Sequence, residues 1–358
     1  MGGRIHRCNA CDAETPLYNS CGDRHCPKCQ AGNRAAWLAA RQQELLPVEY
    51  HHVVLTVPHE LVPVAAAHPV VFYNLLFRAV RETLLEVAAT PRHLGARIGG
   101  LMVLHTWGQT LERHPHVHVI VPGGGLSPDG TRWISCKSGF FLPAPVLSRL
   151  LRGKLLAFLR EAHDRGDLSW PSGLAHLAHP QQFARFLTPL YQKKWAVYAK
   201  PSFGGVEQSL KYLARYTYRV AISNERIESL EDGQVTFRYK DYAHGHRQRR
   251  MTLTAQEFLR RFMLHVLPRG FVRIRSFGFL ANRVRDKQLV LCRQLLGVTQ
   301  PAAATSSGEP ASPANPDDDS LRCPHCGEGV LKLVSRSSRP RVPELVASTY
   351  QPLLFDSS

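Results

Sequence analysis

Short runs of apolar and β-branched residues, each bounded by proline, glycine or polar clusters, predict strands along this chain. The run 50–57 is stopped by Pro58, and the run 116–121 leads into Pro122 and three glycines. Two further runs with the same character are found at 98–105 and 195–199. Segments 226–230 and 235–239 flank Glu-Asp-Gly-Gln, a sequence typical of a β-hairpin turn.

Apolar residues at helical spacing separate these runs. The expected helices are 33–46, 69–89, 144–163, 181–191, 206–219 and 255–266. Strands, one hairpin and covering helices together predict an α+β fold. We expect a central, mainly antiparallel sheet that carries the His-x-His strand, with a small zinc-binding module at the N-terminus.

Composition divides the chain into parts. Residues 1–32 are rich in cysteine and poor in periodic apolar residues, and 33–297 carry the regular elements. Residues 298–320 are rich in alanine, proline, serine and acids, which is typical of a linker. Residues 321–358 form a tail with one Cys-x2-Cys knuckle.

The charge of the chain indicates the kind of partner. The 358 residues include 45 Lys and Arg against 28 Asp and Glu, a net charge of +17. Such a surface attracts polyanions, of which nucleic acid is the commonest. The start lacks the apolar core of a secretory signal, and no run of about 18 apolar residues suggests a membrane span. We therefore expect a cytoplasmic, nucleoid-associated protein.

The sequence His116-Val117-His118 has the spacing of two ligands for one metal ion. Side chains alternate along a strand, so the two imidazoles point the same way with Cβ atoms roughly 6.5 to 7 Å apart. If the preceding turn is centred near Glu112, Gln109 lies closest to His116. Gln109 is then the expected third ligand, with His105 and Glu112 as alternatives. Taken alone, a His-x-His strand is more often structural.

Five of the nine cysteines lie between residues 8 and 29. Two Cys-x2-Cys knuckles supply the four thiolates of a tetrahedral zinc site, and in such a chain the clustering favours metal over disulfides. The expected zinc ligands are Cys8, Cys11, Cys26 and Cys29, with Cys21, His25 and His6 as spare donors. The knuckle Cys323-x2-Cys326 is half a site, to be completed by another chain, by Cys292 or by nothing.

Aromatic residues are interleaved among the arginines of 238–285, a segment that contains 12 Lys and Arg and two acids. Arginine binds phosphates and aromatic rings stack on unpaired bases, a combination suited to single-stranded DNA. The alternative is a solvated face above ordinary core aromatics. The residues expected to contact DNA are Arg215, Arg219, Lys240, Arg247, Arg249, Arg250, Arg273 and Arg275.

Several ordered motifs are similar to those of one family. They are the Tyr-Asn-Ser-Cys and Arg-His-Cys-Pro-Lys-Cys-Gln segments of 18–30, His-Thr-Trp-Gly-Gln at 105–109, His-Pro-His-Val-His at 114–118, Tyr-Leu-Ala-Arg-Tyr at 212–216, and Tyr-Lys-Asp-Tyr at 239–242. Read together, over roughly residues 6–290, the chain resembles the rolling-circle transposases of the insertion-sequence-91 family. These belong to the His-hydrophobic-His group of single-strand nucleases. Relatives usually carry several tens of residues before the first knuckle, so the zinc module is expected to be shortened at its start.

The resemblance implies a DNA strand transferase with two tyrosine nucleophiles, Tyr212 and Tyr216, which helical spacing would place on one face. Tyr218 is a rival nucleophile. His116 and His118 would hold a catalytic Mg²⁺ or Mn²⁺, and the cysteines a structural Zn²⁺. The covalent link would conserve the bond energy, and no phosphate-binding loop is found, so no nucleotide cofactor is expected. Two alternatives remain: a plasmid replication initiator or relaxase with the same chemistry, and a non-catalytic zinc-dependent DNA-binding protein.

Overall fold

The computed structural model describes residues 2–19, 36–201, 221–298 apart from 243, and 322–337 apart from 324. The chain divides into two compact units. One contains residues 1–29 and 302–358, and the other contains residues 30–301. Among the described residues no helix is long and apolar enough to cross a membrane.

The larger unit is built on a five-stranded antiparallel sheet with the order β12-β4-β5-β3-β8. Its strands are β3 (Tyr50–Thr56), β4 (Gly99–Trp107), β5 (Arg113–Pro122), β8 (Val197–Pro201) and β12 (Ile274–Gly278). Gly278 has φ +62°, and a Cβ there would overlap the carbonyl oxygen of Ile98, so glycine lets the end of β12 approach β4. The expected α+β class with a central antiparallel sheet is confirmed.

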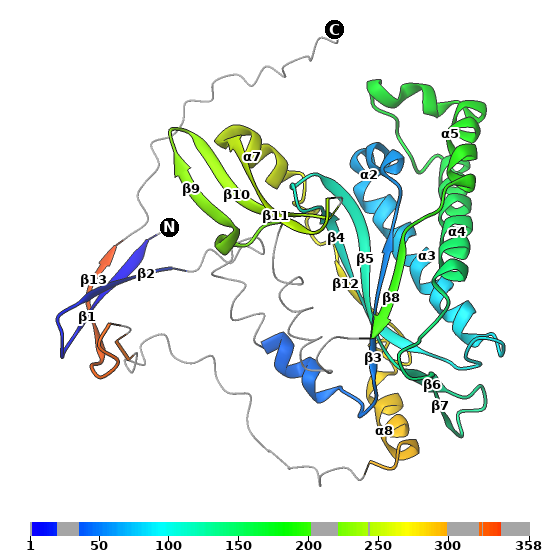
Figure 1. Cartoon of the computed structure of the whole chain (residues 1–358), viewed down its shortest axis with the longest axis horizontal. Coiled ribbons are helices and arrows are strands. Elements are labelled where there is room, and N and C mark those ends of the chain that lie inside the picture. The colour runs from blue at the N-terminus through cyan, green and yellow to red at the C-terminus, as the bar shows by residue number, and fades with distance from the viewer. Residues whose placement is uncertain are drawn as a thin grey trace. The chain divides into compact units, whose positions relative to one another are not determined.

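Helices cover one face of this sheet, where α3 (Pro69–Ala89) and α4 (Ala144–Asp164) lie side by side (Figure 1). Both helices begin with proline in the first turn, where no backbone N–H is needed. The core between helices and sheet includes Leu55, Leu104 and Val119, all fully buried or nearly so. The remaining elements of this layer are η1 (His59–Leu61), α2 (Val62–Ala67), η2 (Ser172–Ala178) and α5 (Pro180–Gln192).

Strand alternation sends a different set of side chains to the opposite face. Leu101 and Val103 of β4 and Ile120 of β5 form a smaller cluster there with Tyr50, against Trp37 from the helical residues 36–43. His105, His116 and His118 continue these same rows of β4 and β5. The histidines therefore lie on the face of the sheet that α3 and α4 do not cover.

A second sheet, β11-β10-β9, follows in the chain. Its strands are β9 (Ile227–Glu231), β10 (Gln234–Asp241) and β11 (Arg247–Thr254), preceded by η3 (Asn224–Arg226) and followed by α7 (Ala255–Met263). Thr254 caps α7 by accepting a hydrogen bond from the N–H of Glu257. The expected hairpin and the helix after it are present, whereas β11, with four polar residues in succession, has no apolar alternation that would have predicted it.

The unit is completed by the ribbon β6 (Gly124–Leu126) and β7 (Trp133–Ser135) and by α8 (Arg285–Leu295).

The smaller unit contains a three-stranded sheet with the order β13-β1-β2. Its strands are β1 (Gly3–Cys8), β2 (Glu14–Tyr18) and β13 (Leu331–Ser337). The N-terminal module and the C-terminal tail thus share one sheet, although the sequence analysis expected them to be separate parts. The pairing of β1 with β13 joins residues more than 300 positions apart.

Candidate metal centre

Three histidines gather at the end of the central sheet. The ligand nitrogens of His105, His116 and His118 lie within 4.8 Å of one another. His105 stands directly opposite His116 in the β4–β5 pair, and His118 is two residues further along β5 on the same face. Three converging imidazoles form one face of a coordination sphere and leave the other positions open for substrate oxygens or water.

The third histidine in this cluster is His105, which the sequence analysis gave as an alternative to Gln109 for the third ligand. The reason is the position of the turn: because His105 pairs with His116, the turn is centred between residues 110 and 111 rather than near Glu112. The side-chain oxygen of Gln109 accepts a hydrogen bond from the N–H of Lys240 at 3.3 Å. The side chain of Glu112 is 72% exposed and faces Arg261.

Contacts of the Nδ1 ring nitrogens orient two of the clustered histidines. Nδ1 of His116 donates to the carbonyl of His114 at 2.6 Å, and Nδ1 of His118 lies 2.7 Å from Nε2 of His52 in β3. Such contacts are the usual supports of a metal-binding histidine, and they assign Nε2 as the nitrogen through which these rings would bind metal. His52 was not identified by the sequence, although it lies in the strand next to His118.

Burial keeps these rings neutral. It lowers the pKa of His116 to about 4 and the pKa of His118 well below its usual 6.5. It also lowers the pKa of His52 to about 4. Neutral imidazole is the form that binds metal, so at pH 7 these rings can bind a metal ion without first losing a proton. A three-histidine set suits Mn²⁺ or another first-row ion better than Mg²⁺, which prefers oxygen.

The histidines open into a pocket of about 560 Å³. Trp107, which stacks on His105 at 4.7 Å, and Tyr242, which is 57% exposed, are among its lining residues, as is Arg226. A ring at the rim of such a pocket can stack on an unpaired base. The pocket therefore combines clustered imidazoles, aromatic rings and a guanidinium.

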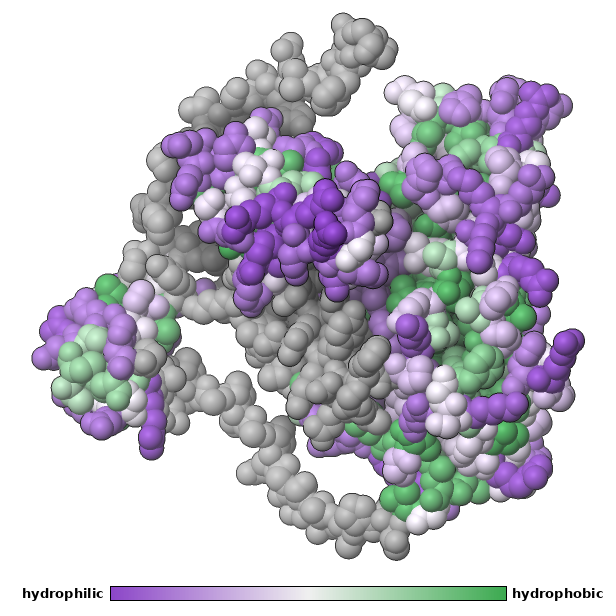
Figure 2. All heavy atoms as spheres, in the orientation of Figure 1, coloured by the Kyte–Doolittle hydropathy of each residue, from purple (hydrophilic) through white to green (hydrophobic). Residues whose placement is uncertain are grey.

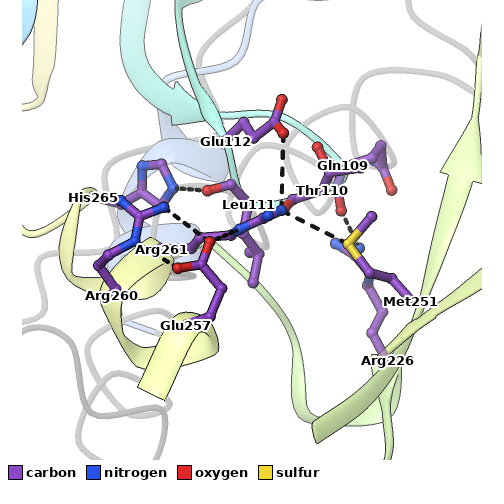
Figure 3. Close-up of polar contacts among 10 residues, drawn as sticks. All are labelled: Gln109, Thr110, Leu111, Glu112, Arg226, Met251, Glu257, Arg260, Arg261 and His265. Carbon is purple, nitrogen blue, oxygen red and sulfur yellow. Dashed lines mark hydrogen bonds and ion pairs between the residues drawn. The ribbon is translucent and has the colours of Figure 1, made fainter. Parts of the chain in front are cut away.

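The loop between the two histidine strands is fixed by side chains from η3, which precedes the second sheet, and from α7 and the residues after it (Figure 3). Arg226 donates to carbonyl 109 at 2.6 Å, Arg261 to carbonyl 110 at 3.1 Å, and His265 to carbonyl 111 at 2.9 Å. Leu111 has φ +64° and is fully buried, in a cluster that includes Phe237 of β10. A left-handed leucine is strained, and the three donors and this burial hold it in place. The loop that sets the β4–β5 register is thus tied to the second sheet.

His265 gives this loop a pH dependence. Burial lowers its pKa to about 4, whereas a histidine in the unfolded chain has a pKa of about 6.5. The unfolded state therefore binds more protons between these values, and the free energy of unfolding falls as the pH drops through this window. Between about pH 7.5 and about pH 5 we expect His265 alone to cost about 2 kcal/mol.

The measurement is urea unfolding of the metal-free protein at both pH values, with the variant His265→Gln beside the wild type. The variant should lose about 2 kcal/mol less than the wild type on acidification, whatever its stability at neutral pH. Equal losses in the two proteins would show that His265 does not carry this proton linkage.

The basic surface lies mainly on β11. Arg247, Arg249 and Arg250 are exposed, and hydrophilic side chains dominate the view over this second sheet (Figure 2). Arg249 pairs with Asp241 and Arg250 with Glu228, while Arg247 has no ion pair among the described residues. Lys240 extends over the ring of Tyr242.

The remaining basic residues are placed differently. Arg275 packs over Phe77 of α3 and donates to Asn74, so its side chain lies on the helix-covered face, away from the histidines. Arg273 is half-buried just before β12. Arg215 and Arg219 lie outside the described residues, as do both candidate nucleophiles, Tyr212 and Tyr216.

The cysteines gather with a different partner knuckle from the expected one. The thiols of Cys8, Cys11, Cys323 and Cys326 all lie within 4.8 Å of one another. Cys26 and Cys29, which the sequence paired with the first knuckle, lie outside the described residues, as do Cys21 and His25. His6 is buried in β1 and is not one of the four clustered donors.

Comparison of the sequence with known proteins identifies the family of this chain. Residues 99–288 match the family model described as "Putative transposase", and residues 1–57 match the "Transposase zinc-binding domain". "Putative transposase y4qJ" of Sinorhizobium fredii is 52% identical over 339 residues, covering 92% of this chain and 84% of that protein. The transposase of insertion sequence element IS801 from Pseudomonas savastanoi pv. phaseolicola is 29% identical, covering 91% and 78%.

Among solved structures, the conjugative relaxase TrwC in complex with oriT DNA matches over 69% of this chain and 73% of its own, with 14% identity and a TM-score of 0.25. A TrwC complex with a 27-mer DNA matches with 13% identity over 68% and 73%, at a TM-score of 0.23. The family matches define the protein as a transposase with a zinc-binding domain. The chain belongs to the insertion-sequence-91 family.

Proposed function

We propose that this transposase cleaves and rejoins single-stranded DNA through a tyrosine, with a divalent metal ion held by His105, His116 and His118. The observation that carries the proposal is the three-histidine cluster, which opens into an aromatic-lined pocket in a chain of the transposase family. Both relatives are named as transposases, which favours transposition over plasmid replication. The protein would act on DNA of the bacterial nucleoid.

When bound, the ion supplies positive charge to a phosphodiester oxygen and stabilises the charge that develops there. The chain's own residues do the rest. The phenol oxygen of Tyr212 or Tyr216 forms a bond to phosphorus as the bond from phosphorus to the 3′ oxygen breaks. The phenol gives its proton to solvent or to a base, and the leaving 3′ oxygen takes up one proton. The products are a 5′-phosphotyrosine and a 3′-hydroxyl. A second tyrosine permits a second cleavage, and reversal of either step rejoins strands.

Basic and aromatic residues would hold the single strand. Arg247, Arg249 and Arg250 supply phosphate contacts, and Tyr242 supplies a stacking surface at the rim of the histidine pocket. The side chains that fix the 108–112 loop would hold this DNA-binding sheet in a constant position relative to the metal ligands. We infer that the two parts act as one surface.

The test is cleavage of a labelled single-stranded oligonucleotide library by the full-length protein. The proposal predicts cleavage with Mn²⁺, none with chelator, and loss of about two orders of magnitude or more in His116→Ala. His179→Ala is the control, because this histidine is exposed beyond η2 and distant in sequence from the cluster. DNA binding without cleavage under any divalent ion would favour a non-catalytic zinc-dependent DNA-binding protein.

A further inference from the structure

Two cysteine knuckles from opposite ends of the chain meet in the smaller unit. Cys8 ends β1 and Cys11 follows in the next turn, while Cys323 and Cys326 lie in the turn before β13. The antiparallel pairing of β1 with β13 places Cys8 opposite Leu331 and so brings the two turns together. Cys8 and Cys323 are each 1% exposed.

The sulfur positions fit a tetrahedral ion. Sγ of Cys8 lies 3.7 Å from Sγ of Cys326, and Sγ of Cys11 lies 3.7 Å from Sγ of Cys323. A tetrahedron with Zn–S bonds of about 2.3 Å has S–S edges of about 3.8 Å. A disulfide would need about 2.05 Å, and all four cysteines are free thiols.

Backbone groups around the sulfurs suit thiolates. The N–H of Ala10 points to Cys8, that of His325 to Cys323 and that of Gly329 to Cys326, at 3.3 to 3.4 Å. A Cβ at residue 329 would overlap Sγ of Cys8, so only glycine allows this approach.

We propose that a single Zn²⁺ joins the two knuckles, with all four of these thiolates as ligands, and closes the two ends of the chain into one domain. The second knuckle lies outside both family matches, which end at residues 57 and 288. The C-terminal segment 322–337 is thereby an integral part of the zinc domain: it supplies half of the ligands and one of the three strands. Cys26 and Cys29 would not share this ion, since four thiolates complete its coordination.

Zinc content of the full-length protein tests the ligand set. The pair variants Cys8→Ser with Cys11→Ser, and Cys323→Ser with Cys326→Ser, should each lose one zinc per chain. The quadruple variant should lose no more than either pair, because both pairs serve one ion. Cys136→Ser is the matched control, a thiol outside the cluster that should retain all zinc. Unchanged zinc in the Cys323 and Cys326 variant overturns the proposal, as does loss of this same zinc in a Cys26→Ser, Cys29→Ser variant.

A second experiment keeps the proposal testable if the serine variants fold poorly. A protease recognition sequence is placed between residues 302 and 320 of the otherwise unchanged protein, which is then cut. The C-terminal fragment should stay with the rest of the chain through size-exclusion chromatography, and it should be released by a zinc chelator. A fragment that separates while the protein keeps all its zinc, or that stays bound after zinc is removed, contradicts a metal that closes the chain ends.

Discussion

Replacing both Tyr212 and Tyr216 by phenylalanine is expected to abolish the covalent protein–DNA adduct and to leave the binding of single-stranded DNA within about threefold of wild type. The loss should be complete, because phenylalanine has no oxygen to attack phosphorus. Binding should persist because the change removes two hydroxyls and leaves the basic sheet and the metal ligands intact. The measurement is a denaturing gel for the adduct, beside a filter-binding curve for affinity.

The single variants sharpen this prediction. If both tyrosines act, each single phenylalanine variant should still form an adduct but should fail in strand exchange, which needs two covalent links. The control is Tyr218→Phe, which removes the neighbouring phenol and should react like wild type. An adduct that survives in the double variant would assign the nucleophile to another residue.

Replacing His105 by alanine is expected to lower Mn²⁺-dependent cleavage by about two to three orders of magnitude and to weaken Mn²⁺ binding, because a third of the protein ligands is lost. Gln109→Ala should change cleavage by less than about threefold, since the Gln109 side chain bonds to the backbone of β10. Mn²⁺ titrations of both variants separate a lost ligand from a disturbed loop. Equal losses in the two variants, or wild-type Mn²⁺ binding by His105→Ala, would contradict the three-histidine site.

Hydrophobic patterning predicted most of the larger unit. The expected strand at 116–121 is contained in β5, and the helices expected at 69–89 and 144–163 correspond to α3 and α4. These elements have strong periodicity because one side of each packs in the main core. Alternation also placed His116 and His118 correctly on one face, since that inference needs only the strand itself.

The identity of the third residue in the histidine cluster depended on tertiary structure. The turn between β4 and β5 is set by Leu111, which adopts a left-handed conformation inside a cluster formed with the second sheet. Nothing local favours that conformation for leucine. A turn centred near residue 112 was the simplest assumption, and a shift of two residues in the centre of the turn exchanges His105 for Gln109 as the partner of His116.

The cysteine pairing could not be derived for a related reason. Spacing identifies a Cys-x2-Cys knuckle, but it does not say which two knuckles meet. The sequence analysis favoured the knuckle nearer in sequence, Cys26 and Cys29, which lies outside the described residues. The pairing of β1 with β13 brings Cys323 and Cys326 to the first knuckle. Strand β11 was not predicted from the sequence for a simpler reason. Its consecutive polar residues are held by pairing with β10 rather than by a buried face.

The proposed function depends on a covalent bond between DNA and a tyrosine of the 212–216 segment. The most direct test is to trap the adduct formed with Mn²⁺, digest the protein and identify the modified peptide by mass spectrometry. We expect a nucleotide attached to Tyr212 or Tyr216, in an adduct that forms only when His105, His116 and His118 are intact. A nucleotide attached elsewhere, to Tyr218 or Tyr242 for example, or an adduct that forms without the three histidines, would contradict it.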